Sequence, residues 1–178
     1  SREALYTLFQ TEGPSIVGIY TNLMTRSSVL DIINHAKAAN WTVILGGPEA
    51  ANYISRYLDH GADFIISGEG EQTLYLLVKS LKEQQDYTAI KGLSFKDNDD
   101  NAHSNPAAKL PGDIDRFPWP DRQAVRIQQY LDSWQQHHGE TSISMITARG
   151  CPYRCNWCSH AVFGYTHRRR DYNDCAAE

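Results

Sequence analysis

The first half of the chain alternates between short apolar runs and longer stretches in which apolar residues recur at helical spacing. The short runs predict strands that are covered on both faces, as in a parallel sheet. The clearest helical stripe is formed by Leu74, Leu77, Val78 and Leu81, which would share one face of a helix. The predicted strands are 15–20, 42–45 and 64–67, and the predicted helices are 2–10, 28–39, 48–60 and 71–84.

This regular alternation predicts the α/β class, with a parallel sheet and helices on both of its faces. In such sheets the ligand crevice lies at the carboxyl ends of the strands. Here those ends carry Thr21-Asn22-Leu23, Gly46-Gly47 and Gly68-Glu69-Gly70-Glu71. The last of these segments also fits a helix-capping turn, because its acidic residues stand at the positive end of the next helix.

From residue 90 onward the pattern changes. Residues 92–95 predict a strand, and the Asp- and Asn-rich stretch 96–105 predicts an exposed hairpin turn. Residues 113–120 are typical of a linker stiffened by proline, with Phe117 and Trp119 available to dock on a neighbouring surface. A helix is predicted over 121–136, and a strand over 142–147 leads into a group of cysteines.

Composition narrows the class of protein. With 41% hydrophobic and 21% charged residues, the chain is expected to be globular. Seventeen Lys and Arg against 21 Asp and Glu give a net charge of −4, which argues against nucleic acid as a partner. No apolar run reaches the roughly 18 residues that span a bilayer, and no signal peptide is evident. The chain begins with Ser1 and both of its ends look cut, so we interpret it as a fragment.

Three of the four cysteines, Cys151, Cys155 and Cys158, fall within eight residues, whereas Cys175 lies apart in a predicted helix. A disulfide framework would spread its cysteines along the chain. The clustering therefore indicates a metal or cluster site in a reducing compartment, and we expect a cytoplasmic protein. Cys175 is interpreted as an ordinary thiol.

The cysteine spacing is C-x3-C-x2-C, and thiolates are soft ligands that suit iron–sulfur clusters or zinc. Three thiolates on a [4Fe–4S] cluster leave one iron open to a substrate or cofactor, because a full protein ligand set would be four. Gly150 would let the backbone approach the cluster closely. The alternative is a closed zinc site that adds His160, although its four ligands would be crowded into ten residues.

The segment 147–159, Thr-Ala-Arg-Gly-Cys-Pro-Tyr-Arg-Cys-Asn-Trp-Cys-Ser, resembles the cluster loop of radical S-adenosylmethionine enzymes. Trp157 fills the aromatic position that precedes the third cysteine in that family. The resemblance implies that Cys151, Cys155 and Cys158 hold a [4Fe–4S] cluster and that the open iron binds S-adenosylmethionine. It also implies reductive cleavage to a 5′-deoxyadenosyl radical, an electron donor such as flavodoxin or ferredoxin, and a small-molecule substrate. Trp157 would lie near the adenine.

The upstream α/β region is similar to that of the cobalamin-binding subgroup of these enzymes. That resemblance implies a Rossmann-like (flavodoxin-like) cobalamin domain over 1–90, incomplete at its N-terminus, a hairpin and linker over 91–140, and the start of a radical β/α barrel over 141–178. The implied reaction is methyl transfer or a related radical transformation. The implied cobalamin contacts are Thr21, Leu23, Gly46, Gly47, Gly68 and Glu69.

Two departures from that pattern leave alternatives open. No Asp-x-His-x-x-Gly segment supplies a lower axial histidine, and further segments that grip S-adenosylmethionine would lie beyond Glu178. One alternative is a radical enzyme whose first domain no longer binds cobalamin. The other is a zinc-braced interaction module without enzymatic activity. No residue of the chain is assigned a catalytic role.

Overall fold

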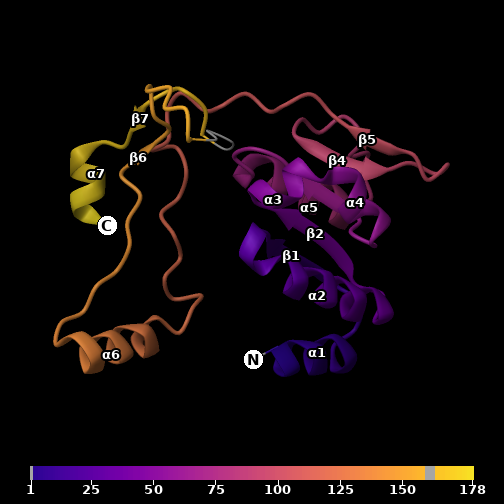
Figure 1. Cartoon of the computed structure of the whole chain (residues 1–178), viewed down its shortest axis with the longest axis horizontal. Helices are drawn as coiled ribbons and strands as arrows, with labels where there is room; N and C mark the ends of the chain where they lie inside the picture. Colours follow the sequence, from indigo (N-terminus) through magenta and orange to yellow (C-terminus); the bar gives the residue numbers. More distant parts are fainter. Residues whose placement is uncertain (1, 159–162) are drawn as a thin grey trace. The chain divides into compact units, whose positions relative to one another are not determined.

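The computed structural model describes residues 2–158 and 163–178 and divides into two compact units (Figure 1). The first unit ends at Leu110 and the second begins at Pro111. The three-part division over 1–90, 91–140 and 141–178 remains a prediction. No helix in the described ranges is both long enough and apolar enough to cross a membrane.

The first unit is built on a five-stranded sheet in the order β1-β2-β3-β4-β5. Strands β1 to β3 are parallel, whereas β4 and β5 form an antiparallel hairpin against β3. The predicted parallel α/β sheet is thus confirmed, and the predicted hairpin adds an antiparallel edge to it. The strands are β1 (Ile16–Tyr20), β2 (Thr42–Gly46), β3 (Phe64–Ile66), β4 (Leu93–Lys96) and β5 (Ala102–Ser104).

Five helices flank this sheet, and the side chains of β2 show which helices cover each of its two faces. Val43 and Leu45 belong to the core beneath the first four helices, whereas Ile44 belongs to the core beneath α5. Successive residues of a strand point to opposite faces, so a continuous apolar run is needed to fill both cores. The helices are α1 (Arg2–Thr11), α2 (Arg26–Ala38), α3 (Pro48–Asn52), α4 (Ile54–Asp59) and α5 (Glu71–Glu83).

Three predictions within this unit were wrong in detail. The single helix predicted over 48–60 is two helices, because Tyr53 between them adopts φ −133° and ψ 43°, outside the helical region. In α5 the stripe is only partly inward: Leu77 is fully buried, but 40% of Leu74 is exposed. Helix α2 also begins earlier than predicted, at Arg26, after a 3-10 turn (Leu23–Thr25) capped by Asn22.

The second unit contains α6 (Ile127–His138), β6 (Ala148–Arg149), β7 (Arg168–Arg169) and α7 (Tyr172–Ala177). Helix α6 begins later than the predicted 121–136. The strand predicted over 142–147 is not formed, since β6 and β7 pair over only two residues each. A strand needs a partner along its length, and the described residues offer 142–147 a backbone partner only at its end, where the Arg170 amide donates to the Thr147 carbonyl. The cysteine segment is therefore part of the connection between β6 and β7.

Candidate functional site

The carboxyl ends of β1 and β2 meet at a close backbone contact between Thr21 and Gly47. The Thr21 amide donates to the Gly46 carbonyl at 2.7 Å, and the Glu49 amide donates to the Thr21 carbonyl at 3.4 Å. Gly47 has φ +98°, and a Cβ placed on it would lie 2.4 Å from the Thr21 carbonyl oxygen. Glycine at position 47 is thus required by the packing of the two strand ends, not by room for a ligand.

Gly46, by contrast, faces open space. A Cβ on Gly46, Gly18 or Gly68 would meet no atom within 4 Å. The parallel register pairs Gly18 with Ile44, so Gly18 and Gly46 share the face of the sheet that α5 covers further along. The backbone at the strand ends is therefore not covered by side chains on that face. A binding slot for a flat or bulky ligand needs such uncovered backbone.

Thr21 and its neighbours combine a buried polar atom with exposed apolar side chains. Thr21 is fully buried, and its Oγ1 has no hydrogen-bond partner within the described residues. A buried hydroxyl without a partner is uncommon and signals a missing water or ligand. Leu23 is 68% exposed and Met24 88%, so the same strand end presents an uncovered apolar surface.

The segment after β3 is more enclosed. Gly68 has φ +81°, a conformation that favours glycine, and Glu69 is buried. A Cβ on Gly70 would lie 2.9 Å from Cγ2 of Ile66, so this glycine allows the N-terminus of α5 to sit against β3. The segment thus works as a turn into α5, and only Gly68 presents open backbone.

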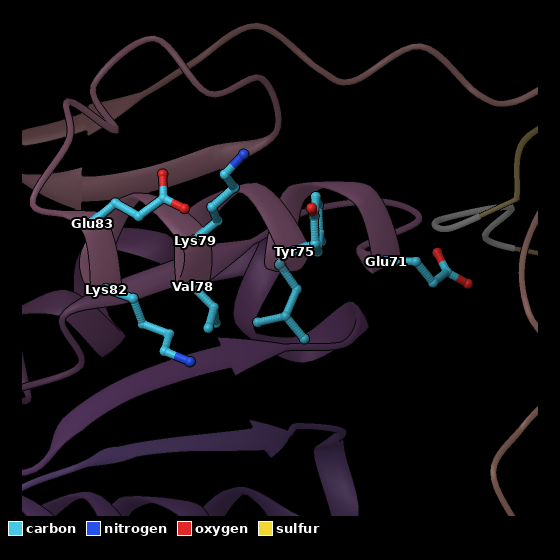
Figure 2. A pocket seen from close by; sticks show the side chains of 7 residues that line it. Glu71, Tyr75, Val78, Lys79, Lys82 and Glu83 are labelled. Carbon is cyan, nitrogen blue, oxygen red and sulfur yellow. The ribbon is translucent and has the colours of Figure 1, made fainter.

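Helix α5 also borders a hollow of about 850 Å³ (Figure 2). The lining combines apolar side chains with lysine and glutamate from one side of the helix. Such a mixture suits a large ligand that has both apolar and anionic groups. The lining residues are Glu71, Leu74, Tyr75, Val78, Lys79, Lys82 and Glu83.

The three clustered cysteines, Cys151, Cys155 and Cys158, are all exposed and free. The Cys158 amide donates to the Cys155 carbonyl at 3.1 Å, which closes a tight turn, and Gly150 has φ +81° at the start of the segment. Within the described residues, no three Cys, His, Asp or Glu side chains are placed to hold a metal ion. The structure thus brings the thiols onto one accessible loop without gathering them, and His160 of the zinc alternative lies outside the described residues.

The aromatic residue before the third cysteine is not part of a core. Trp157 is 88% exposed, so its role is not to pack this loop against the rest of the unit. Other aromatic rings of the second unit do contact arginine side chains. For example, the Cζ atom of Arg154 lies 4.7 Å from the centroid of the Tyr165 ring. An exposed indole beside three exposed thiols is free to stack on a planar ligand.

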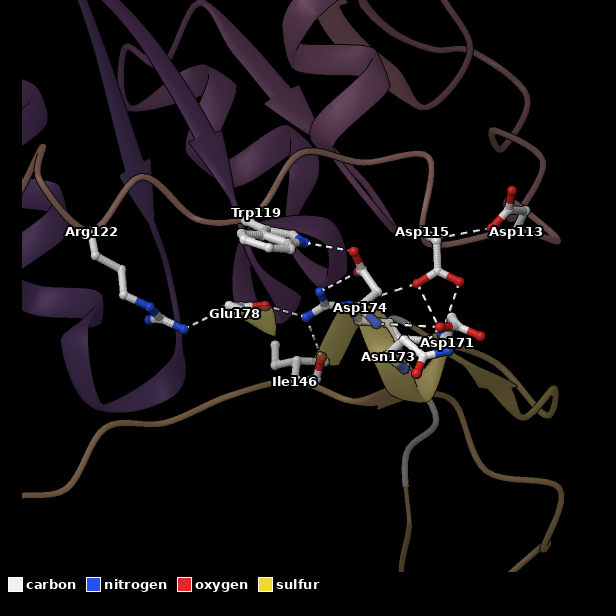
Figure 3. A network of polar contacts seen from close by, with 10 residues as sticks. Asp113, Asp115, Trp119, Arg122, Ile146, Asp171, Asn173, Asp174 and Glu178 are labelled. Atoms are coloured by element: carbon white, nitrogen blue, oxygen red, sulfur yellow. Dashed lines mark hydrogen bonds and ion pairs between the residues drawn. The ribbon is translucent and has the colours of Figure 1, made fainter. Parts of the chain in front are cut away.

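Sequence reasoning missed a polar network centred on Arg170, at the base of the β6–β7 hairpin (Figure 3). The Arg170 side chain is only 11% exposed and forms ion pairs with Asp174, at 2.6 Å, and with Glu178. These two carboxylates raise the pKa of Arg170, and Arg170 in turn lowers the pKa of Asp174. The Arg170 amide also donates to the Thr147 carbonyl at 2.9 Å, which extends the hairpin by one step.

The same network fastens the proline-rich linker to the hairpin, as expected for an aromatic linker that docks. The Trp119 indole donates to Asp174 at 3.0 Å, and the Arg122 guanidinium donates to Glu178 at 2.5 Å. The spacing of Arg170, Asp174 and Glu178 is i, i+4 and i+8, which is the signal in the sequence that could have revealed the cluster.

Comparison with known sequences finds no matching family model. The uncharacterized methyltransferase PH0819 of Pyrococcus horikoshii is 30% identical over 156 residues, which are 84% of this chain and 32% of that protein. The anaerobic magnesium-protoporphyrin IX monomethyl ester cyclase of Synechocystis is 29% identical over 65% of this chain and 22% of its own length. The cobalamin-dependent radical SAM methyltransferase TokK of Streptomyces tokunonensis is 28% identical over 67% of this chain and 18% of its own.

Two solved structures share the fold. The methyltransferase TsrM of Kitasatospora setae, solved with cobalamin and a [4Fe–4S] cluster, matches 99% of this chain and 37% of its own, with a TM-score of 0.75 and 19% identity. The cobalamin-dependent radical enzyme OxsB, solved with aqua-cobalamin, matches 99% of this chain and 24% of its own, with a TM-score of 0.78 and 18% identity. This chain, which spans about a third or less of each of these proteins, is similar in sequence to cobalamin-dependent radical S-adenosylmethionine enzymes and shares their fold.

Proposed function

We propose that this chain carries the cobalamin-facing strand ends and the cluster loop of a radical S-adenosylmethionine enzyme. The observation that carries the proposal is the exposed loop with Cys151, Cys155 and Cys158 in a chain whose α/β sheet also has a bare carboxyl edge. The cysteine loop is the more specific of the two features, and the bare strand ends support the proposal because they occur in the same chain. The reaction we propose is methyl transfer to a small molecule, or a related radical transformation.

The three thiols fit a [4Fe–4S] cluster by their chemistry: they are soft, free and accessible, and they leave the fourth iron without a protein ligand. When bound, such a cluster supplies the electron that splits S-adenosylmethionine to a 5′-deoxyadenosyl radical. The chain's own contribution is to hold the cluster through its thiolates and to present Trp157 to the adenine. Exposed free thiols also favour a reducing compartment such as the cytoplasm, where flavodoxin or ferredoxin would donate the electron.

The strand ends fit cobalamin by their shape. Gly46 and Gly68 leave open backbone, and Leu23 offers an apolar contact. The buried Thr21 hydroxyl has no partner among the described residues, and a ligand could supply one. Glu69 would contact the amide side chains at the corrin edge. Gly47 contributes indirectly, because it allows the loops after β1 and β2 to meet.

Reconstitution of the intact gene product with iron and sulfide, under anaerobic conditions, tests the cluster. We expect broad sulfur-to-iron absorbance in the wild type and none in the triple variant Cys151→Ala, Cys155→Ala, Cys158→Ala. Cys175→Ala is the matched control and should keep the signal, because this thiol lies outside the loop, on α7. Survival of the absorbance in the triple variant, or stoichiometric zinc without iron, contradicts the proposal and supports the zinc-braced module.

Titration of the intact protein with hydroxocobalamin separates the main proposal from a radical enzyme without cobalamin. We expect saturable binding that Thr21→Val weakens several-fold while the fold is kept, because valine has nearly the same shape and removes a hydroxyl that has no partner. Absence of binding in the wild type, with a normal cluster signal, would favour the alternative without cobalamin.

A further inference from the structure

A second hollow in the first unit lies apart from the strand ends that are assigned to cobalamin. It has a volume of about 280 Å³ and is formed by side chains of α2, of α4 and of the residues just before and just after α4. Neither the proposed cluster nor the proposed cobalamin contacts involve these residues. The lining residues are Arg26, Leu30, Tyr53, Arg56, Tyr57 and His60.

Two guanidinium groups meet at this hollow on one aromatic ring. The Cζ atoms of Arg26 and Arg56 lie 5.1 and 5.3 Å from the centroid of the Tyr53 ring. Arg26 is neutralised by the buried carboxylate of Glu49, to which its Nε donates at 2.5 Å. Arg56 has no ion pair with any residue in the described ranges, so the hollow carries one uncompensated positive charge.

A buried hydroxyl group without a hydrogen-bond partner in the described residues lines the same hollow. Tyr57 is 3% exposed, and its hydroxyl forms no hydrogen bond within the part of the chain that the structure describes. Burial and the nearby Glu49 carboxylate raise the pKa of Tyr57 in spite of the opposing effect of Arg26, so the hydroxyl is protonated at neutral pH and can donate a hydrogen bond. An orphaned donor of this kind needs a water or a ligand oxygen.

The remaining wall is held in a fixed orientation. The His60 ring places Nε2 3.2 Å from the Leu30 carbonyl oxygen, which joins α4 to α2. A carbonyl oxygen only accepts, so Nε2 carries the proton and the imidazole is anchored. Two arginine side chains, an orphaned hydroxyl and an anchored imidazole therefore surround one space.

We propose that this hollow binds a small oxyanion with the character of phosphate. Guanidinium groups match the oxygens of phosphate in a planar, two-point arrangement. Arg56 supplies the charge, Arg26 supplies further donors, and the Tyr57 hydroxyl gains its missing acceptor. The ligand is either free phosphate or a phosphate group carried by a larger molecule, and both share this chemistry.

Calorimetric titration of the intact gene product with inorganic phosphate at low ionic strength tests the proposal, and it needs neither cluster nor cobalamin. We expect one saturable site, at least tenfold weaker binding in Arg56→Gln, and unchanged binding in Arg2→Gln. Arg2 is the matched control because its side chain is 57% exposed on α1 and does not line the hollow. Adenosine 5′-monophosphate in place of phosphate tells a carried phosphate group from the free ion by tighter binding.

Tyr57→Phe provides a second readout, independent of charge. Removal of an orphaned hydroxyl should weaken phosphate binding several-fold without lowering the thermal midpoint of the free protein. A lowered midpoint would show that the hydroxyl already has a partner, and would overturn its proposed role. Absence of saturable phosphate binding in the wild type, or equal binding in Arg56→Gln, overturns the site as a whole, whatever the outcome of the cluster and cobalamin tests.

Discussion

The carboxylate of Glu178 forms an ion pair with the guanidinium of Arg170, although only 4% of the Glu178 side chain and 11% of the Arg170 side chain are exposed. A buried charge is tolerated only when it is paired and hydrogen-bonded, and Glu178 meets this condition through a second bond from Arg122. One carboxylate thus joins the linker to the base of the hairpin that carries the cysteines.

Glu178→Gln should therefore destabilise the second unit, because it leaves two guanidinium groups without their shared counter-charge. We expect a clearly lower thermal midpoint, measured by circular dichroism on the intact protein. Glu140→Gln is the matched control, since Glu140 is an exposed glutamate near the end of α6. Equal midpoints for the two variants would show that the ion pair does not stabilise this unit.

The basic run that contains Arg170 illustrates what the sequence could not decide. Read alone, residues 168–170 suit either a solvated stretch or an anion site. The structure instead buries Arg170, which precedes α7, against Asp174 of that helix and Glu178 just after it, at the spacing of successive helical turns. The sequence shows where charged residues lie along the chain, but only the packing of the folded chain decides which of them form ion pairs.

Gly47→Ala should cost more than about 2 kcal/mol of folding free energy, because it combines a strained positive φ with a Cβ that would overlap the Thr21 carbonyl oxygen. Gly46→Ala should change stability by less than about 0.5 kcal/mol, since its Cβ meets no atom within 4 Å. Urea denaturation of both variants measures the difference. A Gly46→Ala variant as unstable as Gly47→Ala would refute the assignment of open space to position 46.

Leu77→Ala should destabilise the first unit by about 2 to 4 kcal/mol, because Leu77 is fully buried between α5 and the sheet. Leu76→Ala, one residue away and 38% exposed, should cost no more than about 0.5 kcal/mol. Chemical denaturation distinguishes the two. Similar losses would mean that α5 does not pack on the sheet through the face described above.

The β4–β5 hairpin should lose stability in acid. A hydrogen bond from His103, together with backbone amides of the turn, lowers the pKa of Asp97 to about 2. A carboxyl group whose folded pKa lies below its unfolded value stabilises the fold above pH ~4, and that contribution disappears as the pH falls towards the folded pKa. Asp97→Asn should thus be less stable than wild type at pH 6, and the gap should close near pH 2. A gap independent of pH would exclude this origin.

The three parallel strands were predictable because each is a short apolar run between two helical stripes, and the burial of β2 and β3 on both faces calls for apolar residues. The break in the helix at Tyr53 was not, since no glycine or proline marks it. The strand expected over 142–147 was not formed because most of its length has no pairing partner in the described residues. Its pattern is compatible with a strand, but the pairing partner available in the described residues reaches only β6 and the adjacent Thr147.

The sequence predicts where the candidate site lies, but not what each of its residues does. The sequence correctly puts residues 21, 46 and 68 at strand ends, because parallel strands share one carboxyl edge. It could not separate Gly47, which serves the backbone contact, from Gly46, which leaves room. That distinction depends on how closely the Thr21 backbone approaches Gly47, between two loops that are 26 residues apart in sequence.

The contact between Gly47 and Thr21 has a mechanical consequence. Because the loops after β1 and β2 touch through their backbones, and the Thr21 amide donates a hydrogen bond to the Gly46 carbonyl, neither loop can be displaced without moving the other. A cofactor bound at these two loops would contact a single rigid surface. Its affinity would depend on how well its shape matches a surface that is already formed in the free protein.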